Sequence, residues 1–66
     1  MASLGEEFTK EQARVREVLA AYYALGPCGA FGAFEIERTL KMADSAVMSG
    51  DVAAMIATFK DLQGIQ

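Results

Sequence analysis

The sequence predicts an all-α protein that folds as a three-helix hairpin or bundle. Apolar residues recur at helical spacing in three segments, and no segment shows the strict alternation of a half-buried strand. Two breaks, Gly26-Pro27 and Ser49-Gly50-Asp51, separate these segments. The predicted helices cover residues 10–25, 29–49 and 52–63 of a single small domain, residues 1–66, in which residues 1–8 form a flexible N-terminal segment.

The first predicted helix starts at about residue 10, because Thr9-Lys10-Glu11-Gln12 fits a capping box. Phe8 precedes this cap and is expected to pack against Ala13. Gly26 tolerates the positive φ that follows a helix end, and Pro27 stops the helix from continuing. The apolar stripe of this helix is Val15, Val18, Leu19, Tyr22 and Leu25.

The second predicted helix carries an unusually broad apolar face. Its start lies between residues 28 and 32, because Pro27 suits a first turn while Gly29 and Gly32 each cost about 1 kcal/mol inside a helix. Its face is wider than one neighbouring helix needs, so we expect contact with both neighbours or with another subunit. The main stripe is Ala33, Ile36, Leu40, Ala43 and Val47, broadened by Phe31, Thr39, Met42 and Ala46.

The third predicted helix is bounded by local signals at both ends. Gly50 ends the preceding helix, Asp51 caps the new one, and Gly64 follows its last turn. Connections this short favour neighbouring, roughly antiparallel helices. The predicted stripe of this helix is Val52, Met55, Ile56, Phe59 and Leu62.

Length and composition predict self-association. The chain has 66 residues, one cysteine and no histidine, so neither an internal disulfide nor a zinc site is expected. A chain of this size buries only a small core, and 53% of its residues are hydrophobic. Oligomerisation is the simplest remaining source of stability, so we expect a homodimer or small oligomer.

Charge and the N-terminal residues bear on partners and location. The net charge is −3 and the basic residues are dispersed, which argues against direct binding of nucleic acid. The N-terminal residues lack the basic and apolar regions of a secretory signal. Together with the lone cysteine, this predicts a cytoplasmic protein.

Residues 18–34 contain no charged side chain and admit three interpretations: a buried corner, a membrane-inserting hairpin, or a surface that contacts a partner. The membrane interpretation is disfavoured, because Gly26-Pro27 divides the run into halves too short to cross a bilayer and no basic cluster flanks it. The spacing of Gly26, Pro27, Gly29 and Gly32 instead predicts a close-packing corner, at which the first helix or a second subunit approaches the backbone.

Five residues are candidates for partner contact: Tyr23, Phe31, Phe34, Glu35 and Met42. Phe34 is predicted to point away from the main stripe, and Glu35 would need a cationic partner if an interface covered it. The spacing of Glu37 with Lys41, and of Glu35 with Arg38, favours ion pairs on a solvated face.

The sequence predicts no enzyme, with no catalytic, cofactor-binding or metal site. No carboxylate has an acid–base companion, and the absence of histidine excludes a Cys–His nucleophile. Cys28 has two interpretations: a thiolate with a lowered pKa near a helix start, or a small apolar filler at a tight corner.

Two segments carry a resemblance to known proteins: Leu25 to Phe34, LGPCGAFGAF, and Met48 to Val52, MSGDV. With the helix between them, they resemble small uncharacterised proteins encoded by phages and prophages of proteobacteria, over roughly residues 15–64. The resemblance implies a phage-related accessory role and assigns no activity or site residue.

The expected function is therefore a non-enzymatic protein–protein interaction module that associates with itself through an apolar helix face, with a phage or host protein as a further partner. The alternative is a membrane-active protein of the lysis-accessory type that inserts residues 18–34.

Overall fold

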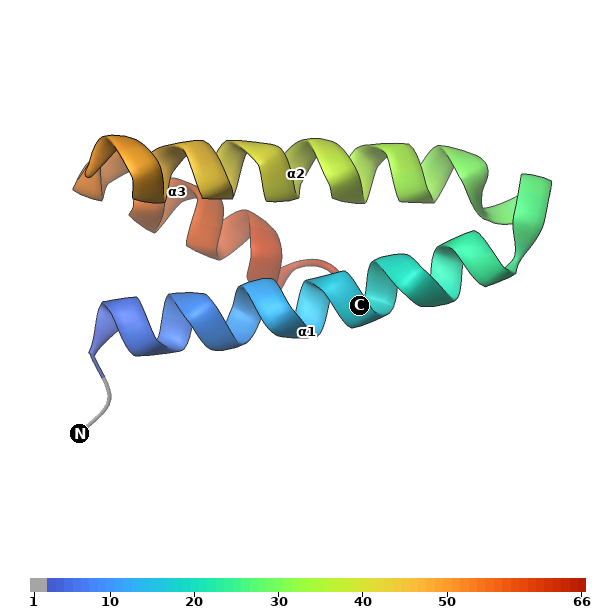
Figure 1. Cartoon of the computed structure of the whole chain (residues 1–66), viewed down its shortest axis with the longest axis horizontal. Coiled ribbons are helices and arrows are strands. Elements are labelled where there is room, and N and C mark those ends of the chain that lie inside the picture. The colour runs from blue at the N-terminus through green and yellow to red at the C-terminus, as the bar shows by residue number, and fades with distance from the viewer. Residues whose placement is uncertain (1–2) are drawn as a thin grey trace.

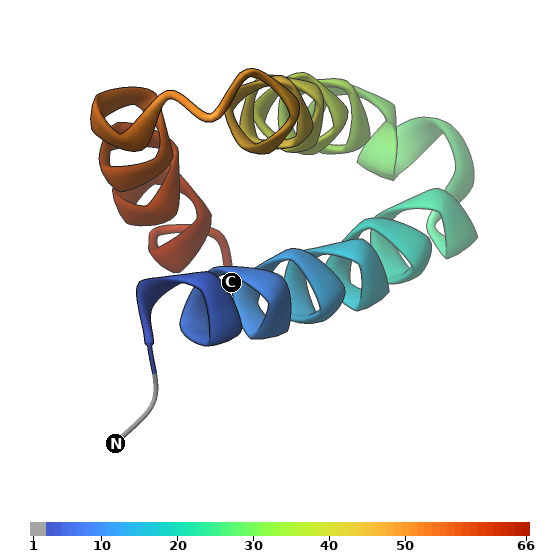
Figure 2. The ribbon, with the colours of Figure 1, turned by 60° about the vertical axis from the view of Figure 1, so that its left-hand side comes forward.

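The computed structural model describes residues 3–66 and confirms the all-α prediction, since three α-helices pack together and this range contains no strand. α1 and α2 form an antiparallel hairpin, and α3 packs across its open end (Figures 1 and 2). A single turn of 3₁₀ helix, η1, closes the other end. The elements are α1 Leu4–Ala24, η1 Gly26–Gly29, α2 Ala30–Ser49 and α3 Val52–Gln63.

α1 begins at Leu4, so the prediction of a flexible segment over residues 1–8 is wrong from Ser3 onward; residues 1–2 lie outside the described residues. Ser3, not Thr9, caps the helix: its hydroxyl accepts a hydrogen bond of 3.2 Å from the amide of Glu6. The Thr9 hydroxyl donates to the Gly5 carbonyl inside the helix. Ser3-Leu4-Gly5-Glu6 fits the same capping pattern as the segment at Thr9, and tertiary packing selects the earlier start.

That packing comes from Phe8, which is only 1% exposed. Its ring stacks on that of Phe59 in α3, with the ring centroids 6.1 Å apart. A phenylalanine at this position can be buried only if the first turns of α1 are in place beneath α3. The contact with α3 therefore extends α1 toward the N-terminus.

The two chain reversals follow the local chemistry of their residues. Gly26 has φ 65° and Gly50 has φ 67°, both in the left-handed region that favours glycine. At the second reversal the amide of Asp51 donates to the Ala46 carbonyl and that of Gly50 to the Val47 carbonyl, which is a Schellman motif. The Asp51 carboxylate then accepts from the amide of Ala54 at 3.0 Å, and α3 spans the predicted residues.

The hydrophobic core joins all three helices at the open end of the hairpin. Val18, Leu19 and Tyr22 of α1 continue this packing toward η1 in partly buried positions. α3 does not reach that far, so the hairpin end beside η1 consists of α1 and α2 alone (Figure 1). The buried cluster is Phe8, Val15, Ile36, Leu40, Ala43 and Leu62.

The predicted stripes of α2 and α3 are too broad. On α2, Ala46 is buried, but Phe31, Met42 and Val47 are exposed. On α3, Val52 and Ile56 are exposed, whereas Thr58 is buried and satisfies its hydroxyl on the carbonyl of Ala54 at 2.8 Å. Each helix has neighbours on one side only, so residues at the margin of a helical stripe remain in solvent.

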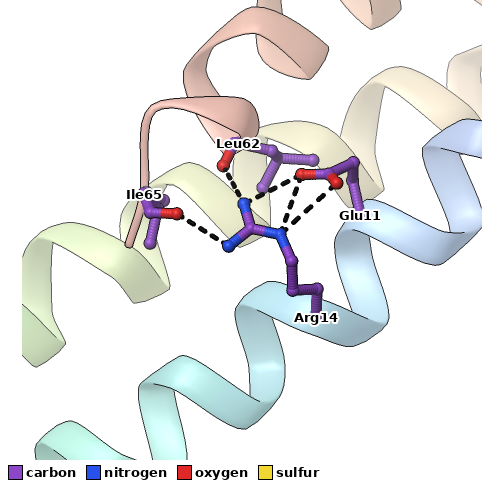
Figure 3. Close-up of polar contacts among 4 residues, drawn as sticks. All are labelled: Glu11, Arg14, Leu62 and Ile65. Carbon is purple, nitrogen blue, oxygen red and sulfur yellow. Dashed lines mark hydrogen bonds and ion pairs between the residues drawn. The ribbon is translucent and has the colours of Figure 1, made fainter.

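Polar contacts fix how α1 meets the other two helices. The Arg14 guanidinium donates to the carbonyl oxygens of Leu62 and Ile65, each at 2.8 Å, and to the Glu11 carboxylate at 2.9 Å (Figure 3). These bonds hold the end of α3 against the middle of α1. The Glu11 carboxylate also raises the pKa of Arg14 above its ordinary value, because it accepts a hydrogen bond from the charged guanidinium.

Asp44 plays the equivalent part between α1 and α2. Its carboxylate accepts a hydrogen bond of 2.7 Å from the Gln12 amide and forms an ion pair of 2.9 Å with Arg16. Asp44 lies near the open end of the hairpin, so these contacts set the alignment of α1 and α2 at the end opposite η1.

Candidate partner interface

The corner at η1 is a place of close backbone approach. Gly29 is buried, and a Cβ atom there would collide with the carbonyl oxygen of Tyr22 and lie 3.1 Å from Leu25 Cβ. A Cβ atom at Gly32 would overlap the ring of Tyr22. In both cases the neighbour is α1 of the same chain. These glycines therefore let the ends of α1 and α2 meet, with Gly26 and Pro27 making the turn between them.

All five predicted contact residues lie at the surface, and four are on one helix. Phe31 is 79% exposed, Phe34 62% and Met42 51%. Side chains three, four or seven residues apart share a face of a helix, so these three lie with Glu35 and Arg38 on the side of α2 opposite the buried Ala33, Ile36 and Leu40. We call this surface the outer face: Phe31, Phe34, Glu35, Arg38 and Met42.

Phe34 lines two hollows in this surface. One has a volume of about 250 Å³ and is otherwise lined by Glu37, Arg38, Lys41 and Met42. The other has a volume of about 340 Å³, and its lining includes Tyr23 and Gly26 from the far side of the turn. Phe34 thus lies between the hollow beside Met42 and the hollow at the corner, and Tyr23 extends the apolar surface onto α1.

The charged side chains on and beside the outer face form no ion pairs with one another. The pairs expected from sequence, Glu37 with Lys41 and Glu35 with Arg38, are not formed; the ion pairs within residues 3–66 are Lys10–Glu7, Arg14–Glu11 and Arg16–Asp44. Two carboxylates and two cations beside exposed aromatic rings are therefore free to meet charges on another molecule.

A second apolar surface lies around the connection between α2 and α3, and sequence reasoning missed it. Met48 is 89% exposed, and Val47, Val52 and Ile56 are each about half exposed. The sequence predicted that Val47, Val52 and Ile56 face the core, so this exposed surface was not predicted. It borders the break at Gly50 and carries no aromatic residue, in contrast with the outer face of α2.

The remaining predicted features concern chemistry and membranes. Cys28 is exposed in η1. Among residues 3–66 no group of three or more histidine, cysteine, aspartate or glutamate side chains is placed to hold a metal ion. The uncharged residues 18–34 are divided between α1, η1 and α2, and no helix in the described part of the chain is long and apolar enough to cross a membrane.

Comparison of the chain with protein-family models, with curated proteins and with solved structures yields no match.

Proposed function

We propose that this protein is a non-enzymatic interaction module that associates with itself through the outer face of α2. The observation that carries the proposal is the exposure of Phe31, Phe34 and Met42 on one side of one helix. Side chains of this size are the usual anchors of protein interfaces, whereas a monomer gains nothing from leaving them in water.

The magnitudes argue against a very tight dimer held by these rings alone. Burying a phenylalanine side chain is worth about 1.5–3 kcal/mol, so four rings at a symmetric interface contribute roughly 6–12 kcal/mol. Association costs about 4–15 kcal/mol in lost translational and rotational freedom, a range that overlaps this gain, so the rings alone do not provide tight binding. A dissociation constant of about 1 micromolar corresponds to a binding free energy of about −8 kcal/mol. Measurements of association must therefore extend to protein concentrations well above about 1 micromolar.

The proposal includes a biological setting. The resemblance of LGPCGAFGAF and MSGDV to proteins of phages and prophages supports a phage-related accessory role, in which a phage or host protein is a further partner. The lone cysteine, Cys28, is typical of a reducing compartment and supports action in the cytoplasm. A pull-down from the native host, compared with one using Phe34→Ala, tests the further partner.

The mass of the protein in solution tests self-association. Light scattering or sedimentation from about 1 to about 500 micromolar should show the mass rise from that of one chain to that of a small oligomer. α2 offers a matched pair of variants, since Met42 lies on the outer face and Met48 lies near Gly50. Met42→Glu should hold the chain as a monomer, and Met48→Glu should associate like the wild type.

Two results would contradict the proposal. A wild-type chain that is helical by circular dichroism and monomeric at the highest concentration does not self-associate. Equal loss of association in Met42→Glu and Met48→Glu would show that the contact does not depend on the outer face.

A further inference from the structure

The charges along the outer face follow a fixed order. Glu35 and Glu37 come first along α2, and Arg38 and Lys41 follow within the next two turns. None of the four forms an ion pair with another residue among positions 3–66. The helix thus presents an acidic half and a basic half beside Phe34 and Met42, which line a common hollow with Arg38 and Lys41.

We propose that the occupant of this face is a second copy of the chain, with the two α2 helices packed antiparallel about a two-fold axis that passes close to Arg38. The inference rests on the proposed function and adds the orientation and register of the dimer. It follows from charge complementarity: an antiparallel arrangement sets the acidic half of each helix against the basic half of the other. A parallel arrangement sets like charges together, which is unfavourable.

The register follows from the rise of about 1.5 Å per residue in an α-helix. With the axis at Arg38, Phe34 of one copy lies at the height of Met42 in the other, and the apolar side chains alternate across the contact. Glu37 and the second copy's Lys41 fall on the same flank, about 3 Å apart along the helix axis. On the other flank, each Arg38 reaches toward the Glu35 of the other copy.

A second copy fits this face better than a partner of one charge. An acidic partner would match Arg38 and Lys41 but would meet Glu35 and Glu37 with repulsion, and a basic partner would do the reverse. Only a surface with the same two halves in the opposite order satisfies all four groups. The two-fold axis supplies such a surface, because in an isologous dimer each copy presents the same patch to the other.

Disulfide trapping of the full chain tests the orientation. Cys28→Ser removes the native thiol, and single cysteines are then placed by Arg38→Cys or by Ser45→Cys; Ser45 is exposed on α2. A disulfide needs Cα atoms about 4.4–6.8 Å apart. In the antiparallel dimer the two copies of position 38 meet at the axis, whereas the two copies of position 45 are about 21 Å apart.

We expect Arg38→Cys to form a covalent dimer in a glutathione redox buffer and Ser45→Cys to remain reduced at the same protein concentration. A covalent dimer of Ser45→Cys would show a parallel arrangement and overturn the inference, while self-association itself stood. The inference is also overturned if Arg38→Cys itself dimerises by light scattering under reducing conditions but does not cross-link in the redox buffer at the same concentration. A chain that never dimerises contradicts the proposed function, and the inference fails with it.

Charge exchange tests the pairing without cysteines. Glu37→Lys alone should weaken dimerisation by about tenfold or more, because it sets two cations together in both of the symmetry-related Glu37–Lys41 pairs. Adding Lys41→Glu restores the opposite-charge pair and the net charge, so the double variant should dimerise about as tightly as the wild type. A double variant as weak as Glu37→Lys would contradict the pairing, with circular dichroism confirming that both variants are helical.

Discussion

The guanidinium of Arg14, in the middle of α1, donates a hydrogen bond of 2.8 Å to the carbonyl oxygen of Leu62, in the last turn of α3. The last carbonyl groups of a helix have no partner within the helix, and a cation there also interacts favourably with the helix dipole. Arg14 therefore joins the end of α3 to α1 through a contact that Glu11 holds in place from the other side (Figure 3).

Replacing Arg14 by methionine should lower the midpoint of thermal unfolding, because the carbonyl groups of Leu62 and Ile65 both lose their charged donor. The unfolding midpoint of Arg14→Lys should lie between those of Arg14→Met and the wild type, since an ammonium group cannot reproduce the forked geometry of the guanidinium. Arg16→Met is the matched control, and its effect should be smaller, because within residues 3–66 the hydrogen bonds and the ion pair of Arg16 all go to the half-exposed Asp44. Equal midpoints for Arg14→Met and the wild type would contradict the role assigned to Arg14.

The effect of Arg14→Met should not depend on pH between neutral and mildly alkaline solution. Glu11 raises the pKa of Arg14 in the folded chain. A group with a raised folded pKa contributes stability that is complete below its unfolded pKa and is lost only as the pH passes the folded one. For arginine both values lie above this range. Thermal unfolding of the wild type and of Arg14→Met at several pH values measures the difference between their midpoints, which should stay constant.

Phe8→Ala should destabilise the fold by about 3–5 kcal/mol, as expected for a buried phenylalanine whose cavity cannot close. A domain of this length has only a few kcal/mol of stability in total, so much of the protein should be unfolded at room temperature. Phe31→Ala is the matched control at a concentration where the chain is monomeric, and it should change stability by less than about 0.5 kcal/mol. Urea unfolding measures both, and similar values for the two variants would contradict the early start of α1.

The ion pair of Arg16 with Asp44 should contribute little. Both side chains are about half exposed, and such pairs are worth about 0.2–1 kcal/mol. Asp44→Ala should cost more than Arg16→Ala, because it also removes the acceptor of Gln12. The effect of Arg16→Ala should shrink in high salt, which screens exposed charges. A cost for Arg16→Ala that is unchanged in about 1 M salt would show that the pair is not an ordinary surface contact.

The features predicted well from sequence are those fixed by neighbouring residues. Gly50 and Asp51 set the end of α2 and the start of α3 through hydrogen bonds that span only a few residues. The start of α1 was predicted wrongly because its decisive contact, Phe8 on Phe59, joins opposite ends of the chain. Helical spacing could not distinguish Ser3 from Thr9 as the cap, and only the position of α3 does so.

The candidate interface was found from sequence only in part. Helical phase placed Phe34 off the main stripe, and its exposure agrees. Helical spacing also placed Met42 on the broad apolar face of α2. A single wide stripe and two separate apolar surfaces give the same spacing of apolar residues, so spacing alone does not distinguish them. The positions of α1 and α3 distinguish them. The hydrogen bonds from Arg14 to the end of α3 could not be predicted from sequence, since every residue has a backbone carbonyl that could accept them.

Gly29 and Gly32 at the corner should respond to alanine to different degrees, according to what their Cβ atoms meet. At Gly29 the obstacle is the backbone carbonyl of Tyr22, which cannot move without breaking the end of α1, so Gly29→Ala should cost about 1–3 kcal/mol. At Gly32 the obstacle is the half-buried ring of Tyr22, which can turn aside, and alanine gains about 1 kcal/mol of helix propensity. Gly32→Ala should therefore cost less than Gly29→Ala.

Gly5→Ala supplies the control for this comparison. Gly5 lies in the first turn of α1, and the nearest atom to an added Cβ is the Ser3 hydroxyl at 3.8 Å, an ordinary contact. Alanine there should stabilise the protein by about 0.4–1 kcal/mol, because it restricts the unfolded chain without strain in the folded one. Urea unfolding should rank the variants with Gly5→Ala above the wild type and Gly29→Ala lowest. If Gly29→Ala is as stable as Gly5→Ala, the ends of α1 and α2 do not approach each other as closely as the structure shows.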